Sequence, residues 1–322
     1  MSKKNILITG AFGFVGTNIS VRLSENQDFI LYALDINCNQ NNKNFIGCYD
    51  WDSFGELSKV KFDTIIHLAG KAHDTKNRSL EQSYIDINVG LTEKIFDFFI
   101  NTQSRKFIFF SSVKAVSDKV KGEFLTEDSE PDPQTPYGKS KRLAEKYILS
   151  KKTESFQKIY ILRPCMIHGA GNKGNLNLLY NLVSKGIPWP LGSFHNKRSF
   201  LSIENLSFIL EKLIENEAES DIYQVSDDEP LSTNNLIEII ACSLNKKIKI
   251  WNLSPKLVRF AAKTGDFFYL PLNSERLKKL TESYVVSNSK IKNALNLVKM
   301  PVTAYEGMKK TIEIFTSSNA EK

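Results

Sequence analysis

A tyrosine and a lysine four residues apart are the side chains of this chain best suited to moving a proton. Tyr137 and Lys141 lie in the run 136–141, and residues at this spacing share one face of a helix. A nearby ammonium favours the phenolate, so Lys141 is expected to lower the pKa of Tyr137 from its ordinary value near ~10. Tyr137 would then act as an acid and a base near neutral pH.

A serine upstream completes the candidate catalytic set. Ser112 lies 25 residues before Tyr137, at the end of the apolar run 107–110. That run predicts a buried strand, and open α/β sheets bind ligands at the carboxyl ends of their strands. Ser112, Tyr137 and Lys141 are therefore the predicted catalytic residues, although the tyrosine–lysine spacing alone would equally suit an ordinary amphipathic helix.

A glycine-rich turn near the amino terminus supplies a second chemical signal. The apolar run 5–9 leads into Gly10, Gly13 and Gly16, and a helix-like segment follows. These glycines suit a tight turn, a close approach of backbone to a pyrophosphate, and close packing of helix on strand. Their spacing differs from the general dinucleotide fingerprint, but the next apolar run, 29–34, ends in Asp35. A carboxylate there accepts the ribose hydroxyls of NAD and repels a 2′-phosphate, so NAD is the predicted cofactor.

Composition narrows the function classes. The 322-residue chain has 43 basic and 36 acidic residues and a net charge of +7, without a block of five like charges. This balance disfavours a nucleic-acid partner and suits a small anionic substrate. The four histidines and four cysteines (Cys38, Cys48, Cys165 and Cys242) show no metal-ligand spacing, so no metal is expected.

No targeting or membrane signal is visible in the sequence. The start at Met1 leads directly into a strand, without a signal peptide, and no run approaches the ~18 apolar residues of a membrane helix. We therefore expect a cytoplasmic protein with reduced cysteines and no membrane insertion.

Strand and helix patterns alternate through the first half of the chain. Strands are predicted at 5–9, 29–34, 45–48, 63–68, 106–111 and 158–162, and helices at 14–25, 80–102 and 136–154. This alternation predicts an α/β fold, a Rossmann doubly wound parallel sheet. Beyond Gly169 the chain is rich in glycine and proline, with helices at 176–185 and 203–217, a strand at 222–226, and short helices and loops after 231. The predicted division is a cofactor domain of residues 1–168, to which 200–227 returns, and a smaller interleaved substrate-binding domain of 169–199 and 228–322.

Seven short motifs in this order resemble those of the extended short-chain dehydrogenase/reductase family, in its nucleotide-sugar epimerase/dehydratase branch. They are residues 9–16, 67–70, 88–92, 111–112, 137–141, 162–164 and 198–203. Asp35 and Asp50 lie between the first two, and the resemblance spans essentially the whole chain. Within the family the chain is most similar to UDP-hexose 4-epimerase-like proteins associated with surface polysaccharides. The resemblance implies a UDP-sugar substrate and leaves a homodimer open as the assembly.

The resemblance also implies roles for individual residues. Tyr137 would exchange the proton of the sugar 4-hydroxyl, Lys141 would bind the nicotinamide ribose, and Ser112 would bond the reacting oxygen. Asn175, Leu191 and Arg198 would hold the uridine diphosphate. Cofactor binding is assigned to Gly10, Gly13, Phe14, Val15, Gly16, Asp35, Asp50, Trp51, Leu68, Ala69, Gly70, Asn88, Tyr137, Lys141 and Pro164.

Departures from the family pattern narrow the reaction. In the 4,6-dehydratases an Asp-Glu pair follows the hydroxyl residue, whereas Val113 and Lys114 follow Ser112 here, so dehydration is not expected. Lys71 and His73 are further candidates for contact with the sugar. Trp189 is either a ligand-stacking residue or a buried loop anchor.

Three functions remain open from the sequence. The first is a 4-epimerase, in which a tightly held NAD is used and restored. The second is an NAD(P)H-dependent 4-keto reductase of a UDP-4-keto-6-deoxy-N-acetylhexosamine, which would use the same three residues. The third is a non-catalytic nucleotide-sensing protein, disfavoured because a binding protein needs no proton-transferring tyrosine.

Overall fold

Seven parallel strands form the central sheet of the protein. The computed structural model describes residues 3–38, 42–72, 80–172, 175–268 and 273–320. In these residues the strand order is β3-β2-β1-β4-β5-β6-β9, with every neighbouring pair parallel. The strands are β1 (Lys4–Thr9), β2 (Phe29–Leu34), β3 (Gly47–Tyr49), β4 (Thr64–His67), β5 (Lys106–Phe110), β6 (Lys158–Pro164) and β9 (Asp221–Val225).

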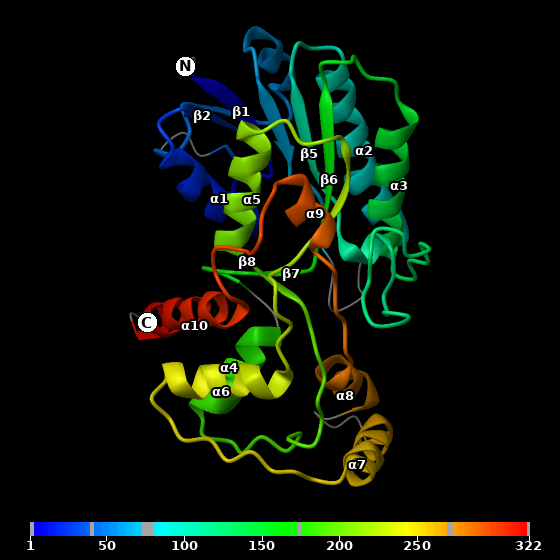
Figure 1. The fold of residues 1–322 in the computed structure, drawn as a ribbon, viewed down its shortest axis with the longest axis vertical. Coiled ribbons are helices and arrows are strands. Elements are labelled where there is room, and N and C mark those ends of the chain that lie inside the picture. Colours follow the sequence, from blue (N-terminus) through cyan, green and yellow to red (C-terminus); the bar gives the residue numbers. More distant parts are fainter. Residues whose placement is uncertain (1–2, 39–41, 73–79, 173–174, 269–272, 321–322) are drawn as a thin grey trace.

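Helices cover both faces of this sheet, as a parallel sheet requires. The helices α1 (Phe14–Ser24) and α5 (Ile203–Glu215) lie on one face, and α2 (Glu81–Ile100) and α3 (Pro136–Ser150) lie on the other (Figure 1). Successive residues of a strand point to opposite faces. Accordingly, Ile6 and Ile8 of β1 join the core under α1 and α5, whereas Leu7 joins the core under α2 and α3.

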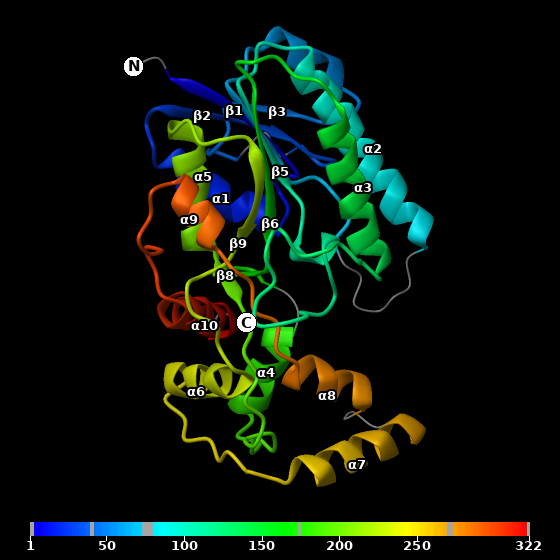
Figure 2. The ribbon, with the colours of Figure 1, turned by 45° about the vertical axis from the view of Figure 1, so that its right-hand side comes forward.

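A smaller helical part lies beyond the carboxyl ends of the strands (Figures 1 and 2). It contains α4 (Asn175–Ser184), α6 (Thr233–Ser243), α7 (Pro255–Phe267), α8 (Ser274–Thr281) and α10 (Ala304–Ala320). A separate apolar cluster that includes Tyr180, Ile240 and Met308 forms its core. The parallel pair β7 (Met166–His168) and β8 (Phe200–Ser202) carries the chain out of the large part and back again.

The doubly wound parallel sheet is confirmed, and most of the predicted strands and helices agree with it within a few residues. The predicted strand 45–48 is shifted, because Phe45 closes a turn onto Asn42 and enters the core, leaving Gly47–Tyr49 to pair with β2. The helix α10 has 17 residues, where short helices were expected.

One stretch assigned to the substrate-binding domain packs elsewhere. The helix α9 (Ser289–Ala294) lies against β9, and Ile291, Leu295 and Met300 belong to the core of the large part. The chain therefore returns to the large part twice, once through β8 to β9 and once around α9. Among the described residues, no helix is long and apolar enough to cross a membrane.

Candidate active site

Ser112 and Tyr137 meet at the carboxyl end of β5. Ser112 follows that strand and caps the short 3-10 turn Val113–Ala115, while Tyr137 lies in the first turn of α3, which Thr135 caps through the Gly138 N–H. The two side chains are hydrogen-bonded, and this bond lowers the pKa of Tyr137. Burial has the larger effect, so the pKa of Tyr137 is raised above its ordinary value. The ring of Tyr84 packs edge-on against Tyr137, with 6.4 Å between centroids.

Lys141 lies one turn further along α3, as the four-residue spacing predicted. Its Nζ donates a 2.8 Å hydrogen bond to the Phe110 carbonyl, and a Cβ on Gly70 would come within 3.5 Å of it. Burial lowers the pKa of Lys141 to about 8, and the negative charge of Glu145 opposes this. The expected lowering of the Tyr137 pKa by Lys141 is wrong for this arrangement, because burial dominates and Lys141 is not among the groups that shift it.

A buried carboxylate that the sequence did not indicate links α3 to the neighbouring strand ends. Glu145, one turn beyond Lys141 on α3, accepts bonds from Arg163 Nε at 2.8 Å and Arg163 Nη2 at 2.7 Å. It also accepts from Ser111 Oγ at 2.6 Å and from Arg142 Nη1 at 2.9 Å. Glu145 and Arg163 are 0% and 1% exposed, so these are charge-assisted bonds in a protected interior. Through them α3 is tied to the ends of β5 and β6, which sets Ser112 against Tyr137.

Asn88 has a positioning role in the loop after β4. Its amide donates to Ser140 Oγ at 2.9 Å and to the Lys71 carbonyl, while its oxygen accepts from the Lys71 N–H at 2.6 Å. Because Asn88 is completely buried and its side-chain groups are engaged, the predicted cofactor contact is not supported. The Asn88 bonds instead fix Gly70 and Lys71 beside α3. His73 lies outside the described residues, and the Lys71 ammonium bonds Ser83 Oγ at 2.8 Å.

The glycine turn has the shape of an anion-binding cradle. Gly10 has φ +68°, a conformation that favours glycine, and a Cβ on Gly16 would lie 2.3 Å from the Gly10 carbonyl oxygen. Gly13 caps α1, so the first N–H groups of the helix, at Phe14 and Val15, have no side-chain cap. A helix amino terminus of this kind attracts phosphate.

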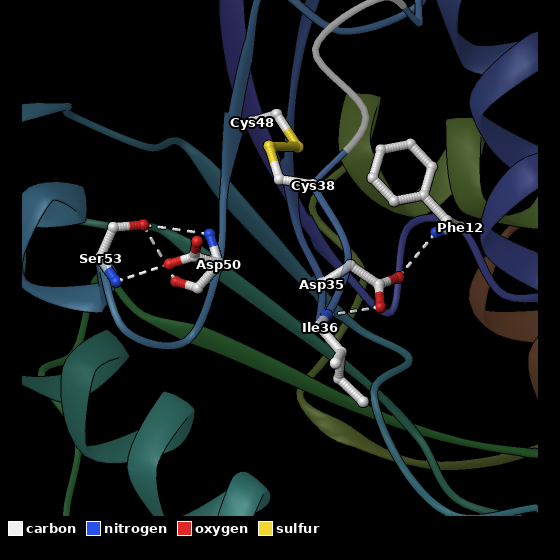
Figure 3. The surroundings of a disulfide bond; sticks show 7 residues. All are labelled: Phe12, Asp35, Ile36, Cys38, Cys48, Asp50 and Ser53. Carbon is white, nitrogen blue, oxygen red and sulfur yellow. Dashed lines mark hydrogen bonds between the residues drawn. A yellow bond between two sulfur atoms is a disulfide. The ribbon is translucent and has the colours of Figure 1, made fainter.

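Asp35 faces this turn from the end of β2. Its carboxylate accepts the Phe12 N–H at 2.8 Å and the Ile36 N–H at 2.7 Å (Figure 3). The glycine cradle, the open helix end and the carboxylate at the neighbouring strand end fit the pyrophosphate and the adenosine ribose of NAD. These residues therefore match the cofactor in chemistry and in place.

The other predicted cofactor residues fall into two groups. Leu68, Ala69 and Gly70 follow β4 at the carboxyl edge of the sheet, where Ala69 N–H donates to Thr9 Oγ1, and Pro164 is the buried last residue of β6. Asp50 and Trp51 follow β3, further along the same edge. Asp50 exchanges hydrogen bonds with Ser53 that lower its pKa, and the Trp51 ring stacks on Phe54.

The expectation that all cysteines remain reduced is wrong for one pair. Cys38 and Cys48 form a disulfide, with 5.7 Å between their Cα atoms (Figure 3). Cys48 lies on β3 opposite Ala33 of β2, and the disulfide ties it to the segment that follows β2. Cys165 and Cys242 are free thiols.

Arg198 lies where the two parts of the chain meet. Its backbone pairs with Leu231 and Tyr284, and its Nη1 donates to the Lys279 carbonyl at the end of α8. Lys114, which the sequence analysis considered only for dehydration, lies beside it. The Lys114 ammonium is 3.3 Å from Asp118 Oδ1 and 4.6 Å from the centre of the Tyr284 ring. Burial, and to a smaller extent the Arg198 charge, lower the pKa of Lys114, and the Asp118 carboxylate opposes this. The Lys114 N–H donates to Ser112 Oγ, so Lys114 is next to the Ser112–Tyr137 pair.

The remaining substrate predictions receive less support. Leu191 is 2% exposed and belongs to the core of the smaller part, so a substrate contact by its side chain is not supported. Trp189 is a buried loop anchor whose Nε1 donates to Asn234 Oδ1 at 2.8 Å. Asn175 begins α4, and its side chain lies outside what the structure describes.

The parallel sheet, the glycine turn and Asp35 at the neighbouring strand end are the features of a dinucleotide-binding fold. A family model described as "NAD dependent epimerase/dehydratase family" matches residues 6–226. The chain belongs to this family, and it is therefore an NAD-dependent enzyme.

Similar proteins extend over almost the whole chain. A UDP-glucose 4-epimerase of Vibrio cholerae is 32% identical over 98% of this chain and 97% of its own length. An N-acetyl-alpha-D-glucosaminyl-diphospho-ditrans,octacis-undecaprenol 4-epimerase of Escherichia coli O157:H7 is 29% identical over 89% and 84%. The crystal structure of UDP-glucuronic acid 4-epimerase from Bacillus cereus in complex with NAD superposes with a TM-score of 0.74 at 18% identity, covering 97% of this chain and 99% of that one. This last similarity shows the shared fold.

Proposed function

We propose that the protein is a nucleotide-sugar 4-epimerase acting on a UDP-hexose or a UDP-N-acetylhexosamine. The observation that carries the proposal is the hydrogen-bonded Ser112–Tyr137 pair with Lys141 one helical turn away. The similarity to the Vibrio cholerae UDP-glucose 4-epimerase supports the choice of reaction and nucleotide. The product would serve surface polysaccharide synthesis, as the family resemblance implies.

NAD would be held by the glycine turn, by the amino terminus of α1, by Asp35 and by Lys141. When bound, it supplies the hydride acceptor and donor for C4 of the sugar and the positive charge of its oxidised ring. Tyr137 takes the proton of the 4-hydroxyl and later returns it, and Ser112 orients the reacting oxygen by hydrogen bonding. Because the pKa of Tyr137 is raised, its side chain is a neutral phenol in the protein without bound NAD. Positive charge near the ring, such as that of the oxidised cofactor, would lower this pKa and allow Tyr137 to act as the base.

Arg198 and Lys114 would bind the diphosphate of the substrate. Lys114 already pairs with Asp118, and an anion with several oxygens would be attracted to Lys114 and Arg198 together. The guanidinium of Arg198 also offers the planar fork that pairs with phosphate oxygens. This assignment gives Lys114 a function in the position where the dehydratases place a carboxylate.

The proposal is tested by assaying the purified protein without added cofactor. We expect NAD to copurify and to support interconversion of UDP-glucose and UDP-galactose, or of their N-acetyl forms, followed by NMR. Absence of interconversion, combined with oxidation of NAD(P)H by a UDP-4-keto-6-deoxy sugar, would establish the reductase instead. Both reactions use Ser112, Tyr137 and Lys141, so only the product separates them.

A further inference from the structure

The helix α7 presents large apolar side chains to solvent. Leu257, Phe260, Phe267 and Phe268 are 67%, 70%, 78% and 63% exposed. The spacings of three and seven residues between Leu257, Phe260 and Phe267 place them on one side of the helix. Isolated exposed apolar residues are ordinary on protein surfaces, but several large apolar side chains exposed side by side on one helix indicate a contact surface.

This stripe is separate from the side of α7 that packs on the protein. Val258, Ala262 and Gly265 are the buried residues of α7, and they follow one another at intervals of four and three. The helix is therefore already anchored by its own apolar face. The exposed stripe is a second apolar face, and the described part of the chain leaves it uncovered.

Basic residues run alongside the exposed stripe. Lys256, Arg259 and Lys263 repeat at intervals of three and four, just to one side of Leu257 and Phe260 on the helix. All three are exposed, and none makes an ion pair with a described residue. A helix with aromatic and aliphatic residues on one side and lysine and arginine beside them is suited to the boundary between lipid head groups and acyl chains.

We propose that α7 adsorbs onto the surface of an anionic membrane, with its phenylalanines among the acyl chains and its basic stripe among the head groups. The positive charge of Lys256, Arg259 and Lys263 favours an anionic membrane over a second copy of the chain as the partner. In a symmetric contact with a second copy, the same basic residues would approach one another, which is unfavourable. Anionic lipids instead attract each lysine or arginine near the surface.

The position of α7 allows this contact. It lies at the end of the molecule remote from the central sheet in both views (Figures 1 and 2). The next helix, α8, packs against α7, and the last turn of α8 accepts the hydrogen bond from Arg198. Adsorption through α7 would thus bring the segment that contacts Arg198 to the membrane surface. The membrane contact itself does not depend on the proposed reaction.

The experiment is flotation of the full-length protein with lipid vesicles. One set contains phosphatidylglycerol mixed with phosphatidylcholine, and the other contains phosphatidylcholine alone, both at about 0.1 M salt. We expect binding to the anionic vesicles that is at least about tenfold stronger than to the neutral ones and that weakens at higher salt. Equal binding to both vesicles, or no binding to either, would overturn the proposal.

Substitutions then locate the contact. The double variants Phe260→Ser/Phe267→Ser and Lys256→Glu/Lys263→Glu should each lose at least about tenfold in vesicle affinity. The control Val298→Ser removes a 93% exposed apolar side chain elsewhere and should bind as the wild type does. Circular dichroism and epimerase activity on UDP-sugars should be unchanged in all three. Undiminished binding by the α7 variants would overturn the proposal, as would a wild-type dimer that Phe260→Ser/Phe267→Ser abolishes in sedimentation.

Discussion

The catalytic edge of the sheet and the α7–α8 end of the smaller part are built in opposite ways. At the edge, the polar side chains of Ser111, Glu145 and Arg163 are buried and bonded to one another, and the buried amide of Asn88 donates to Ser140 Oγ. At the α7–α8 end, large apolar and basic side chains are exposed, and a single described hydrogen bond links Arg198 to α8.

The difference suits two different tasks, proton transfer at the buried edge and ligand or surface recognition at the exposed end. Proton transfer requires atoms held within tenths of an ångström, and a buried network with satisfied partners provides that. Recognition of a nucleotide, or of a membrane, tolerates an adaptable surface and changes among relatives without disturbing the reaction. The catalytic edge should therefore respond to substitution in turnover and stability, and the smaller part in affinity.

The largest effect is expected for Tyr137→Phe. The variant loses only the oxygen that transfers the proton, so turnover should fall by ~10²–10⁴-fold or more while binding of NAD and UDP is nearly unchanged. Single-turnover kinetics and calorimetric titration measure the two quantities. A variant that kept more than about a tenth of the rate would show that Tyr137 is not the acid–base group.

Loss of the buried carboxylate should cost stability. Glu145→Ala leaves Arg163 charged and unpaired in the interior, which typically destabilises a protein by about 3–5 kcal/mol. Urea unfolding measures the change. The matched control is Glu145→Met/Arg163→Met, which removes both charges and should unfold at a higher urea concentration than the single variant; the reverse order would show that the ion pair is not what links α3 to β6.

Arg198→Ala should weaken binding of UDP by about 1.5–3 kcal/mol, the usual contribution of a hydrogen bond to a charged group. Lys197→Ala is the matched control, because it removes a neighbouring exposed cation and should change binding by less than about 1 kcal/mol. Calorimetric titration with UDP, which carries the diphosphate without the sugar, compares them. An equal loss of UDP affinity in both variants would show that Arg198 contributes only as a general surface charge.

Asp35→Asn tests the cofactor end of the catalytic edge. The asparagine keeps the shape of the side chain and one acceptor for the Phe12 N–H, but it loses the charge that repels a 2′-phosphate. Preference for NAD over NADP should therefore narrow by about tenfold, a typical consequence of one charged hydrogen bond. Equal affinity of the wild type for both cofactors would remove Asp35 from the ribose site.

The smallest expected effect is a shift in pH dependence. Lys141, with its pKa lowered to about 8, is a cation below that pH and loses its charge above it. Activity that depends on the ammonium should thus decline as pH rises through about 8. Because the Glu145 charge raises this pKa, Glu145→Gln should move the decline to lower pH. A decline at the same pH in both proteins would assign it to another group.

Patterns within single elements were sufficient to predict the glycine turn and the position of Tyr137 and Lys141 on one helix. Apolar runs, the glycines and the four-residue spacing of Tyr137 and Lys141 are each read within one element, and the parallel sheet then brings the strand ends together. The Glu145–Arg163 pair escaped prediction because its partners are on α3, β5 and β6, and no spacing in the sequence reports that contact.

The misses share the same cause. The family resemblance implies a substrate contact for Leu191, but its side chain packs in the apolar cluster of the smaller part. The pKa of Tyr137 depends on how deeply the ring is enclosed, which a helical spacing does not reveal. The Cys38–Cys48 bond joins β3 to the segment after β2, and the distance between the two cysteines depends on the tertiary path of the chain.

The strand β9 is synthesised well after β6, the strand with which it pairs, and this affects the nascent chain. Until residues 221–225 emerge, the edge of β6 lacks the partner strand that completes the sheet. An unpaired strand edge is a site for association with other chains. The intervening residues after β6 take roughly 3–12 s to translate at ~5–20 residues per second. The nascent enzyme therefore passes through an interval in which its acid–base residues have all been made but its sheet is still open, and chaperone binding would be most useful during that interval.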